Sequence, residues 1–294
     1  MELSIFTQLS LVIVAVAAVS FVMRLLRQPL IMGYILTGIL VGPSFFHLIN
    51  DSEAFETFGE IGITLLLFII GLGLNVSLIK SLGRVVLVAS AIKIISVGLI
   101  GFFLASGFGF NAIESALVGL ALVFSSTIII VKVLSDKREQ SRLYAQITVG
   151  IILVEDILAT FALLFISASA GNDAVGPFEI ALLLLKGVLL AAMLAFLATK
   201  VLPKMTRFFA SSQEFLFLFA LAWGFGVASL FAAAGFSAEV GALFAGVSLA
   251  SLPYTQEIAS RLKPLRDFFV VLFFIVLGES LNLENLSLGF LPAL

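Results

Sequence analysis

Cysteine is absent from this sequence of 294 residues, and its single histidine is His47. The lack of cysteine excludes disulfides, thiolate metal sites and cysteine nucleophiles. Charged residues make up only 12% of the chain, about half the share of a typical soluble domain. The net charge of −2 offers no basic surface for nucleic acid. With one histidine and no metal-ligand cluster, we expect no enzyme activity, no cofactor, no tightly bound metal and no nucleic-acid partner.

Hydrophobic residues make up 61% of the chain, with thirty phenylalanines among them. This composition predicts an all-α, polytopic integral membrane protein whose main partner is the lipid bilayer. The first apolar segment lacks a basic start and a small-residue cleavage site, so we interpret it as a retained helix. Ten segments are long enough, or nearly so, to span: 5–23, 29–47, 58–79, 85–107, 112–133, 145–168, 178–201, 214–234, 237–251 and 266–283.

Basic residues gather in or beside alternate connections between these segments. Fourteen of the sixteen lie there: Arg24, Arg27, Lys80, Arg84, Lys132, Lys137, Arg138, Arg142, Lys200, Lys204, Arg207, Arg261, Lys263 and Arg266. Lysine and arginine near helix ends mark the cytoplasmic side of a membrane. The pattern therefore predicts an amino terminus outside and supports all ten segments together.

Two adjacent carboxylates, Glu155 and Asp156, interrupt the segment 145–168, which has no other charge. A carboxylate at the centre of a bilayer costs about 2.5–3.5 kcal/mol on insertion scales. Neighbouring helical residues point about 100° apart, so the two side chains cannot share one face. The pair predicts a site for a proton or a cation, and the alternative is a static pair neutralised by Lys or Arg.

Three hydroxyl residues, Ser125, Ser126 and Thr127, follow one another in the segment 112–133. They either cap the ends of a broken helix, which would expose carbonyls to a cation, or bond to carbonyls one turn back in an intact helix. Lys93 lies near the middle of the segment 85–107 and is a candidate charge partner for a buried carboxylate. Glu239 begins the segment 237–251, where we expect it to stabilise a helix start.

Two pairs of segments resemble each other at nearly equal offsets. LFIIGLGLN at 67–75 matches FIVLGESLN at 274–282 at an offset of 207, and GYILTG at 33–38 matches GALFAG at 241–246 at an offset of 208. The partners are seven segments apart along the chain. Because seven is an odd number, the two copies run in opposite directions through the membrane, as in secondary transporters. We expect one transmembrane domain over 1–294, with a first repeat at about 1–168, a linking helix at 178–201 and a partial second repeat at 214–294.

Six motifs follow one another along the chain: GYILTGILVGP, LFIIGLGLN, FSSTIIIVKVL, VGIILVEDILA, FSAEVGALFAGVSLA and LFFIVLGESLN. In these motifs and their order the chain resembles the Kef-type branch of the monovalent cation:proton antiporter superfamily, whose members are sodium/hydrogen exchanger-like. The resemblance implies an inverted-repeat fold of thirteen helices, about ten of them present, so that the chain is expected to be truncated. It also implies a homodimer, a regulatory nucleotide-binding domain or subunit, and a prokaryotic plasma membrane.

The same resemblance implies that Asp156 is the essential ion-binding residue and that the helix at Ser125–Thr127 is broken. Glu155 replaces the glutamine that is usual in Kef proteins. We therefore predict exchange of K⁺ or Na⁺ for H⁺ by alternating access, with the cation at Asp156. A cation channel and a sodium-coupled organic solute symporter are the alternatives.

Overall fold

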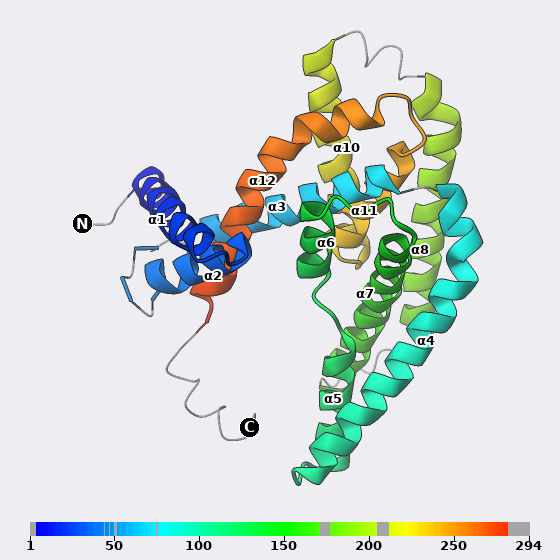
Figure 1. The fold of residues 1–294 in the computed structure, drawn as a ribbon. Helices are drawn as coiled ribbons and strands as arrows, with labels where there is room; N and C mark the ends of the chain where they lie inside the picture. The colour runs from blue at the N-terminus through cyan, green and yellow to red at the C-terminus, as the bar shows by residue number, and fades with distance from the viewer. Residues whose placement is uncertain are drawn as a thin grey trace. The chain divides into compact units, whose positions relative to one another are not determined.

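The computed structural model describes residues 4–43, 45–46, 48–49, 52–74, 76–170, 177–204 and 212–281, and all regular structure in these ranges is helical (Figure 1). The elements are α1 (Ile5–Leu25), α2 (Leu30–Val41), α3 (Ser52–Gly73), α4 (Val76–Gly107), α5 (Ala112–Val123), α6 (Thr127–Asp136), α7 (Leu143–Ala170), α8 (Pro177–Phe196), the π-helical turn η1 (Leu197–Val201), α10 (Gln213–Ala234), α11 (Ala238–Leu249) and α12 (Thr255–Glu279).

Each predicted apolar segment overlaps one or two of these helices, which confirms the all-α membrane architecture. Six stretches in the described part of the chain are long and apolar enough to cross a bilayer, while α2 and α11 are shorter apolar helices. The segment 112–133 is divided into α5 and α6, which confirms the broken helix that the family resemblance implied. Helix α12 begins at Thr255, well before the predicted position 266, because hydrogen bonding continues through polar residues that hydropathy does not detect.

The chain divides into two compact units, Met1–Leu65 with Leu262–Leu294, and Leu66–Arg261. In the first unit, buried side chains of α1, α2, α3, α12 and the connection between α2 and α3 form an apolar core: Val12, Val16, Val41, Ile49, Phe55, Leu272 and Ile275. Helices α3 and α12 pack there with almost no side chain between them. A Cβ added at Gly62 would lie 2.5 Å from the backbone carbonyl carbon of Phe269.

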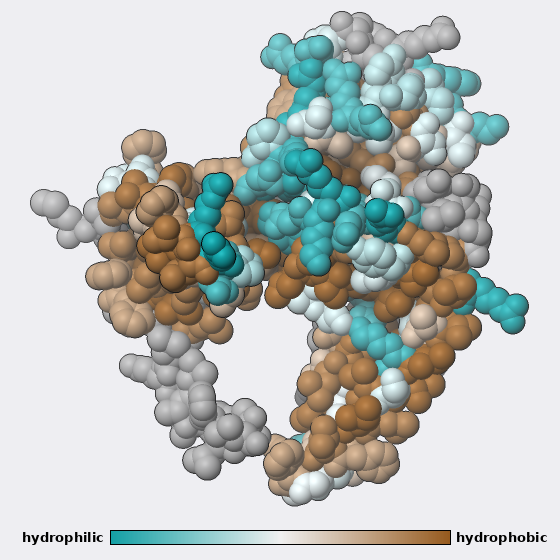
Figure 2. Space-filling model, in the orientation of Figure 1, coloured by the Kyte–Doolittle hydropathy of each residue, from teal (hydrophilic) through white to brown (hydrophobic). Residues whose placement is uncertain are grey.

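The second unit contains α7, with its two carboxylates, and the helices α4 and α5, which pack against each other. Gly101 of α4 and Gly119 of α5 bring those helices into close contact, since a Cβ on Gly101 would lie 2.9 Å from the Cα of Gly119. Gly150 of α7 packs against Val86 of α4. Figure 2 shows apolar side chains along the outer side of α4, which is the surface that a lipid-facing helix presents.

A sharp turn joins α10 to α11 in this same unit. Gly235 ends α10 with φ +98°, a left-handed conformation that glycine adopts without a Cβ penalty. The returning helix α11 begins after Ser237, whose hydroxyl accepts a hydrogen bond from the Val240 amide. The Trp223 indole of α10 donates to the Ser248 hydroxyl of α11 at 2.9 Å and fixes the register of the pair.

Two glycine crossings, one in each unit, have the same geometry. Gly38 of α2 meets Gly278 of α12, and Gly246 of α11 meets Gly71 of α3. A Cβ added at Gly38 would lie 2.0 Å from a carbonyl oxygen of α12, and one added at Gly246 would lie 2.1 Å from a carbonyl oxygen of α3. Offsets of 208 and 207 relate the first crossing to the second. The equivalent positions of the two crossings support the predicted repeat. The repeat relates two parts of the sequence, and its bounds differ from those of the two compact units.

Candidate functional site

A break in a membrane helix forms the first part of the site. Helix α5 ends at Val123, and α6 begins at Thr127, so that Phe124–Ser126 are not helical. The Ser126 hydroxyl accepts a hydrogen bond from the Ile129 amide and caps α6. A helix end leaves its last carbonyls and first amides without partners inside the helix. The break therefore presents carbonyl oxygens at the end of α5 and a positive dipole end at the start of α6.

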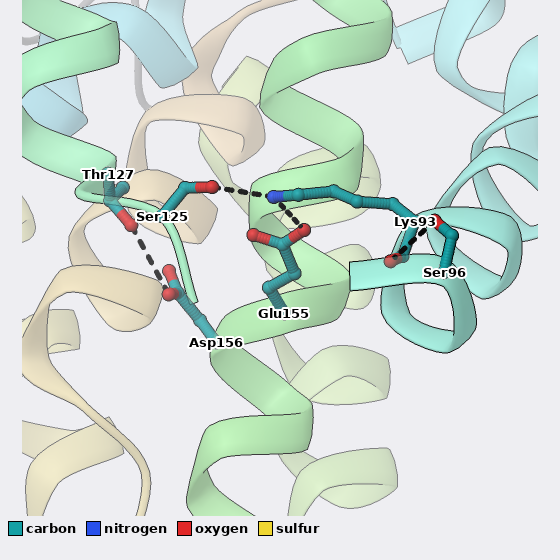
Figure 3. A network of polar contacts seen from close by, with 6 residues as sticks. All are labelled: Lys93, Ser96, Ser125, Thr127, Glu155 and Asp156. Atoms are coloured by element: carbon teal, nitrogen blue, oxygen red, sulfur yellow. Dashed lines mark hydrogen bonds and ion pairs between the residues drawn. The ribbon is translucent and has the colours of Figure 1, made fainter. Parts of the chain in front are cut away.

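Glu155 forms the second part of the site, on the continuous helix α7. Its side chain is 2% exposed, and its Oε1 lies 2.5 Å from Lys93 Nζ of α4. The same ammonium group donates to Ser125 Oγ at 2.5 Å, within the break (Figure 3). Lys93 of α4 therefore connects α7 and the break between α5 and α6 through one charged group. A buried carboxylate without such a partner would be strongly destabilising, so the pair explains how Glu155 is accommodated.

The other oxygen of Glu155, Oε2, is buried and has no hydrogen-bond partner in the described part of the chain. A buried carboxylate oxygen normally accepts at least one hydrogen bond. This oxygen therefore keeps lone pairs available beside the break in the helix.

Asp156 forms the third part of the site and extends from α7 in a different direction from Glu155 (Figure 3). Its Oδ1 accepts a hydrogen bond of 3.3 Å from Thr127 Oγ1, the first residue of α6. The side chain is half-buried. A carboxylate at a helix amino terminus is stabilised by the aligned peptide dipoles, typically by about 0.3–1 kcal/mol. The two adjacent carboxylates thus bind opposite sides of the break, Glu155 through Lys93 and Asp156 through Thr127.

The structure brings five predicted residues into this network and gives the sixth a local role. Lys93 is hydrogen bonded to Ser125 and Glu155, and Thr127 is hydrogen bonded to Asp156. Ser126 instead caps α6 through its hydrogen bond to the backbone. In the described residues, no three side chains of the His, Cys, Asp or Glu types gather as a metal cluster. The arrangement has carboxylate, hydroxyl and carbonyl oxygens, the ligands that hard monovalent cations accept.

Glu239 belongs near this site, although the sequence indicated only a helix start. It lies in the first turn of α11, as expected, but its carboxylate is also close enough to repel the charge of Asp156. A helix of twelve residues spans only about 18 Å, less than the roughly 30 Å thickness of the hydrocarbon core. The shortness of the predicted segment 237–251 was therefore the signal in the sequence that this helix does not span the bilayer alone.

Comparison with known proteins places these residues in a known architecture. A solved structure of the sodium proton antiporter MjNhaP1 from Methanocaldococcus jannaschii matches with a TM-score of 0.55, at 19% identity, over 99% of this chain and 74% of that one. At this level of identity the match demonstrates a shared fold.

Curated proteins match over most of the chain. The "Glutathione-regulated potassium-efflux system protein KefC" of Enterobacter sp. (strain 638) is 31% identical over 87% of this chain and 42% of its own length. The "K(+) efflux antiporter 5" of Arabidopsis thaliana is 27% identical over 97% and 51%. The "Iron transporter MagA" of Paramagnetospirillum magneticum is 28% identical over 92% and 63%. The chain thus spans between about two fifths and two thirds of the length of these relatives.

The family model described as "Sodium/hydrogen exchanger, transmembrane" matches residues 11–294, nearly the whole chain. This match confirms the resemblance that the six sequence motifs indicated. The chain therefore belongs to the transmembrane sodium/hydrogen exchanger family.

Proposed function

We propose that this chain forms the ion-exchanging membrane part of a monovalent cation:proton antiporter, with Asp156 as the carrier of both the cation and the proton. The observation that carries the proposal is the position of Asp156 at the broken helix α5–α6, hydrogen bonded to Thr127. A half-buried carboxylate at such a break holds either a proton or a cation, but not both. This competition couples the two fluxes.

In the proposed cycle, Asp156 binds a cation when ionised and releases it when protonated. The carbonyl oxygens at the end of α5 and the Thr127 hydroxyl supply the oxygen ligands that complete the coordination of the cation. The site opens alternately to the two sides of the membrane, as is general for transporters built from inverted repeats. Glu155 and Lys93 keep the neighbouring charges fixed while Asp156 exchanges its ligand.

We propose K⁺ or Na⁺ as the transported cation. The oxygen ligands of the break support a hard monovalent cation, and they contrast with the nitrogen and sulfur ligands that soft transition metals prefer. The names of two relatives specify potassium, and the solved structure with the same fold is a sodium proton antiporter. Both ions are therefore substrates to test.

The wider context of the chain follows from the same proposal. We place it in a prokaryotic plasma membrane with the amino terminus outside, as the distribution of basic residues predicts. We also propose that it works as a homodimer, together with a regulatory nucleotide-binding domain or subunit. Transport requires no resident cofactor and includes no enzymatic step.

The deciding experiment is transport by the natural full-length protein in proteoliposomes. Addition of K⁺ or Na⁺ should drive a proton flux that an enclosed pH dye reports. Asp156→Asn should reduce this flux to the level of protein-free vesicles, because a neutral amide neither holds a cation tightly nor releases a proton. Asp136→Asn provides the matched control, since Asp136 is an exposed residue at the end of α6 paired with Lys132, and its flux should remain.

Three results would refute the proposal. Cation-driven proton flux that survives Asp156→Asn would remove Asp156 as the carrier. An ion current that is independent of the proton gradient would indicate a channel. Uptake of an organic acid that requires Na⁺ would indicate a symporter.

A further inference from the structure

Lys93 is unusual in this site, because its ammonium group is a fixed cation beside the break where we propose that a mobile cation binds. Its ammonium group lies 2.5 Å from both Ser125 Oγ and Glu155 Oε1, a hydroxyl and a carboxylate oxygen. These are the same kinds of ligand that a transported monovalent cation requires. One of the two carboxylates of α7 therefore already holds a cation that is covalently part of the protein.

We infer that Lys93 fixes the exchange at one cation per proton, by acting as a tethered counter-cation for Glu155. The inference rests on the proposed function and adds the coupling ratio to it. Lys93 and Glu155 together carry no net charge. Asp156 is neutral when protonated and neutral when it holds a monovalent cation. The loaded site then has the same net charge in both halves of the cycle, and exchange moves no net charge across the membrane.

Removal of the Lys93 charge changes this balance in a specific way. Glu155 is 2% exposed, and its Oε2 already has no hydrogen-bond partner in the described part of the chain, so an uncompensated carboxylate would need a new cation or proton. In this variant each carboxylate can accept a proton, whereas the break and Thr127 supply oxygen ligands for one cation, at Asp156. The exchange would then carry two protons against one cation and would become sensitive to the membrane potential.

The measurement is the balance point of the natural full-length protein in proteoliposomes, at which opposed cation and pH gradients stop the proton flux. For one-for-one exchange, flux stops where the cation ratio equals the proton ratio. A membrane potential imposed with a gradient of a permeant anion should leave that point unchanged. The permeant anion allows the same test with K⁺ and with Na⁺.

Four variants separate charge balance from structure. Lys93→Met should make the balance point sensitive to the membrane potential. Without a potential, its flux should stop where the cation ratio across the membrane equals the square of the proton ratio. Lys93→Arg should retain the behaviour of the natural protein. Lys93→Met combined with Glu155→Gln removes both charges together and should restore one-for-one exchange. Lys186→Met is the matched control, since Lys186 lies exposed on α8 away from the network, and its balance point should not change.

Folding of each variant is checked by its thermal unfolding in detergent. A folded Lys93→Met that does not transport still supports the inference if the double variant exchanges one for one, because the bare charge of Glu155 then traps the cation. A folded double variant that fails to transport, beside an active Lys93→Arg, contradicts it.

Further outcomes would also overturn the inference. One is a balance point of the natural protein that moves with potential. Another is a Lys93→Met variant that still exchanges one for one. A third is a change of ratio in Glu239→Gln but not in Lys93→Met, which would assign the second charge to the carboxylate near Asp156. If the natural protein shows no cation-driven proton flux at all, the proposed function fails and not the coupling ratio.

Discussion

At the scale of single residues, the two carboxylates of the site accept side-chain hydrogen bonds of different length. Lys93 donates to Glu155 at 2.5 Å, a short charge-assisted contact between a half-exposed ammonium and a buried carboxylate. Thr127 donates to Asp156 at 3.3 Å, which is long for a hydroxyl donor. The stronger bond belongs to the carboxylate that we propose to be fixed, and the weaker one belongs to the carboxylate that exchanges its ligand.

Thr127 gives a prediction at this scale. Thr127→Val keeps the shape of the side chain but removes the hydroxyl, which we propose as a cation ligand. A hydrogen bond of this kind contributes about 1 kcal/mol, so the apparent KM for the cation should rise roughly fivefold, with a smaller change in the maximal rate. Thr127→Ser keeps the hydroxyl and should stay near the natural KM. The check is the cation dependence of proton flux, and an unchanged KM in Thr127→Val would exclude the hydroxyl as a ligand.

At the scale of helices, glycine decides how closely the elements approach. Gly246 of α11 and Gly71 of α3 let two backbones touch, because a Cβ at Gly246 would meet a carbonyl oxygen at 2.1 Å. By contrast, a Cβ at Gly226 of α10 would meet nothing within 4 Å. Both Gly226 and Gly246 lie inside helices, so helix propensity affects them alike and only the contact differs. A clash with a backbone atom cannot be relieved by rotation of a side chain. Gly246 is therefore the position that does not tolerate a larger residue.

The two glycines therefore form a matched pair for mutation. Gly246→Ala should destabilise the protein by about 1–3 kcal/mol, the usual effect of overpacking. Gly226→Ala should be neutral or stabilising by up to about 1 kcal/mol, since alanine favours a helix more than glycine does. Thermal unfolding in detergent measures both changes. Equal midpoints for the two variants would mean that the α3–α11 crossing is looser than described.

At the scale of the whole molecule, the chain alternates between the two sides of the membrane. Basic residues at alternate connections predict that the loops at Gln28 and Lys137 are cytoplasmic, and that the turn between α4 and α5 at Phe108 faces outward. All three positions are exposed. These 294 residues contain no cysteine, so a single introduced cysteine is the sole thiol within them for labelling.

Labelling of intact cells with a membrane-impermeant maleimide checks this orientation. Phe108→Cys should react in intact cells, whereas Gln28→Cys and Lys137→Cys should react after the membrane is opened. Labelling of the detergent-solubilised protein controls for the intrinsic reactivity of each thiol. The reverse pattern would place the amino terminus in the cytoplasm.

Prediction from the sequence succeeded where apolar residues require a lipid or protein environment. The segment 145–168 indicated a membrane helix, and the structure has α7 there as a continuous helix. Hydropathy alone does not reveal the break at 112–133, which it describes as one span although α5 and α6 are separate. Hydropathy reports how apolar a segment is, and it does not report where backbone hydrogen bonds stop. The hydroxyl residues Ser125–Thr127 were the sole local sign of the break.

The sequence by itself determined that the chain is a bundle of membrane helices with two carboxylates at their centre. Desolvation makes charges in apolar segments so costly that Glu155 and Asp156 stand out whatever surrounds them. Only the tertiary structure decided that Lys93 pairs with Glu155, that Thr127 bonds to Asp156, and that Glu239 approaches the same site. Helical periodicity fixes which residues of one helix share a face, but packing between helices distant in sequence decides which faces meet.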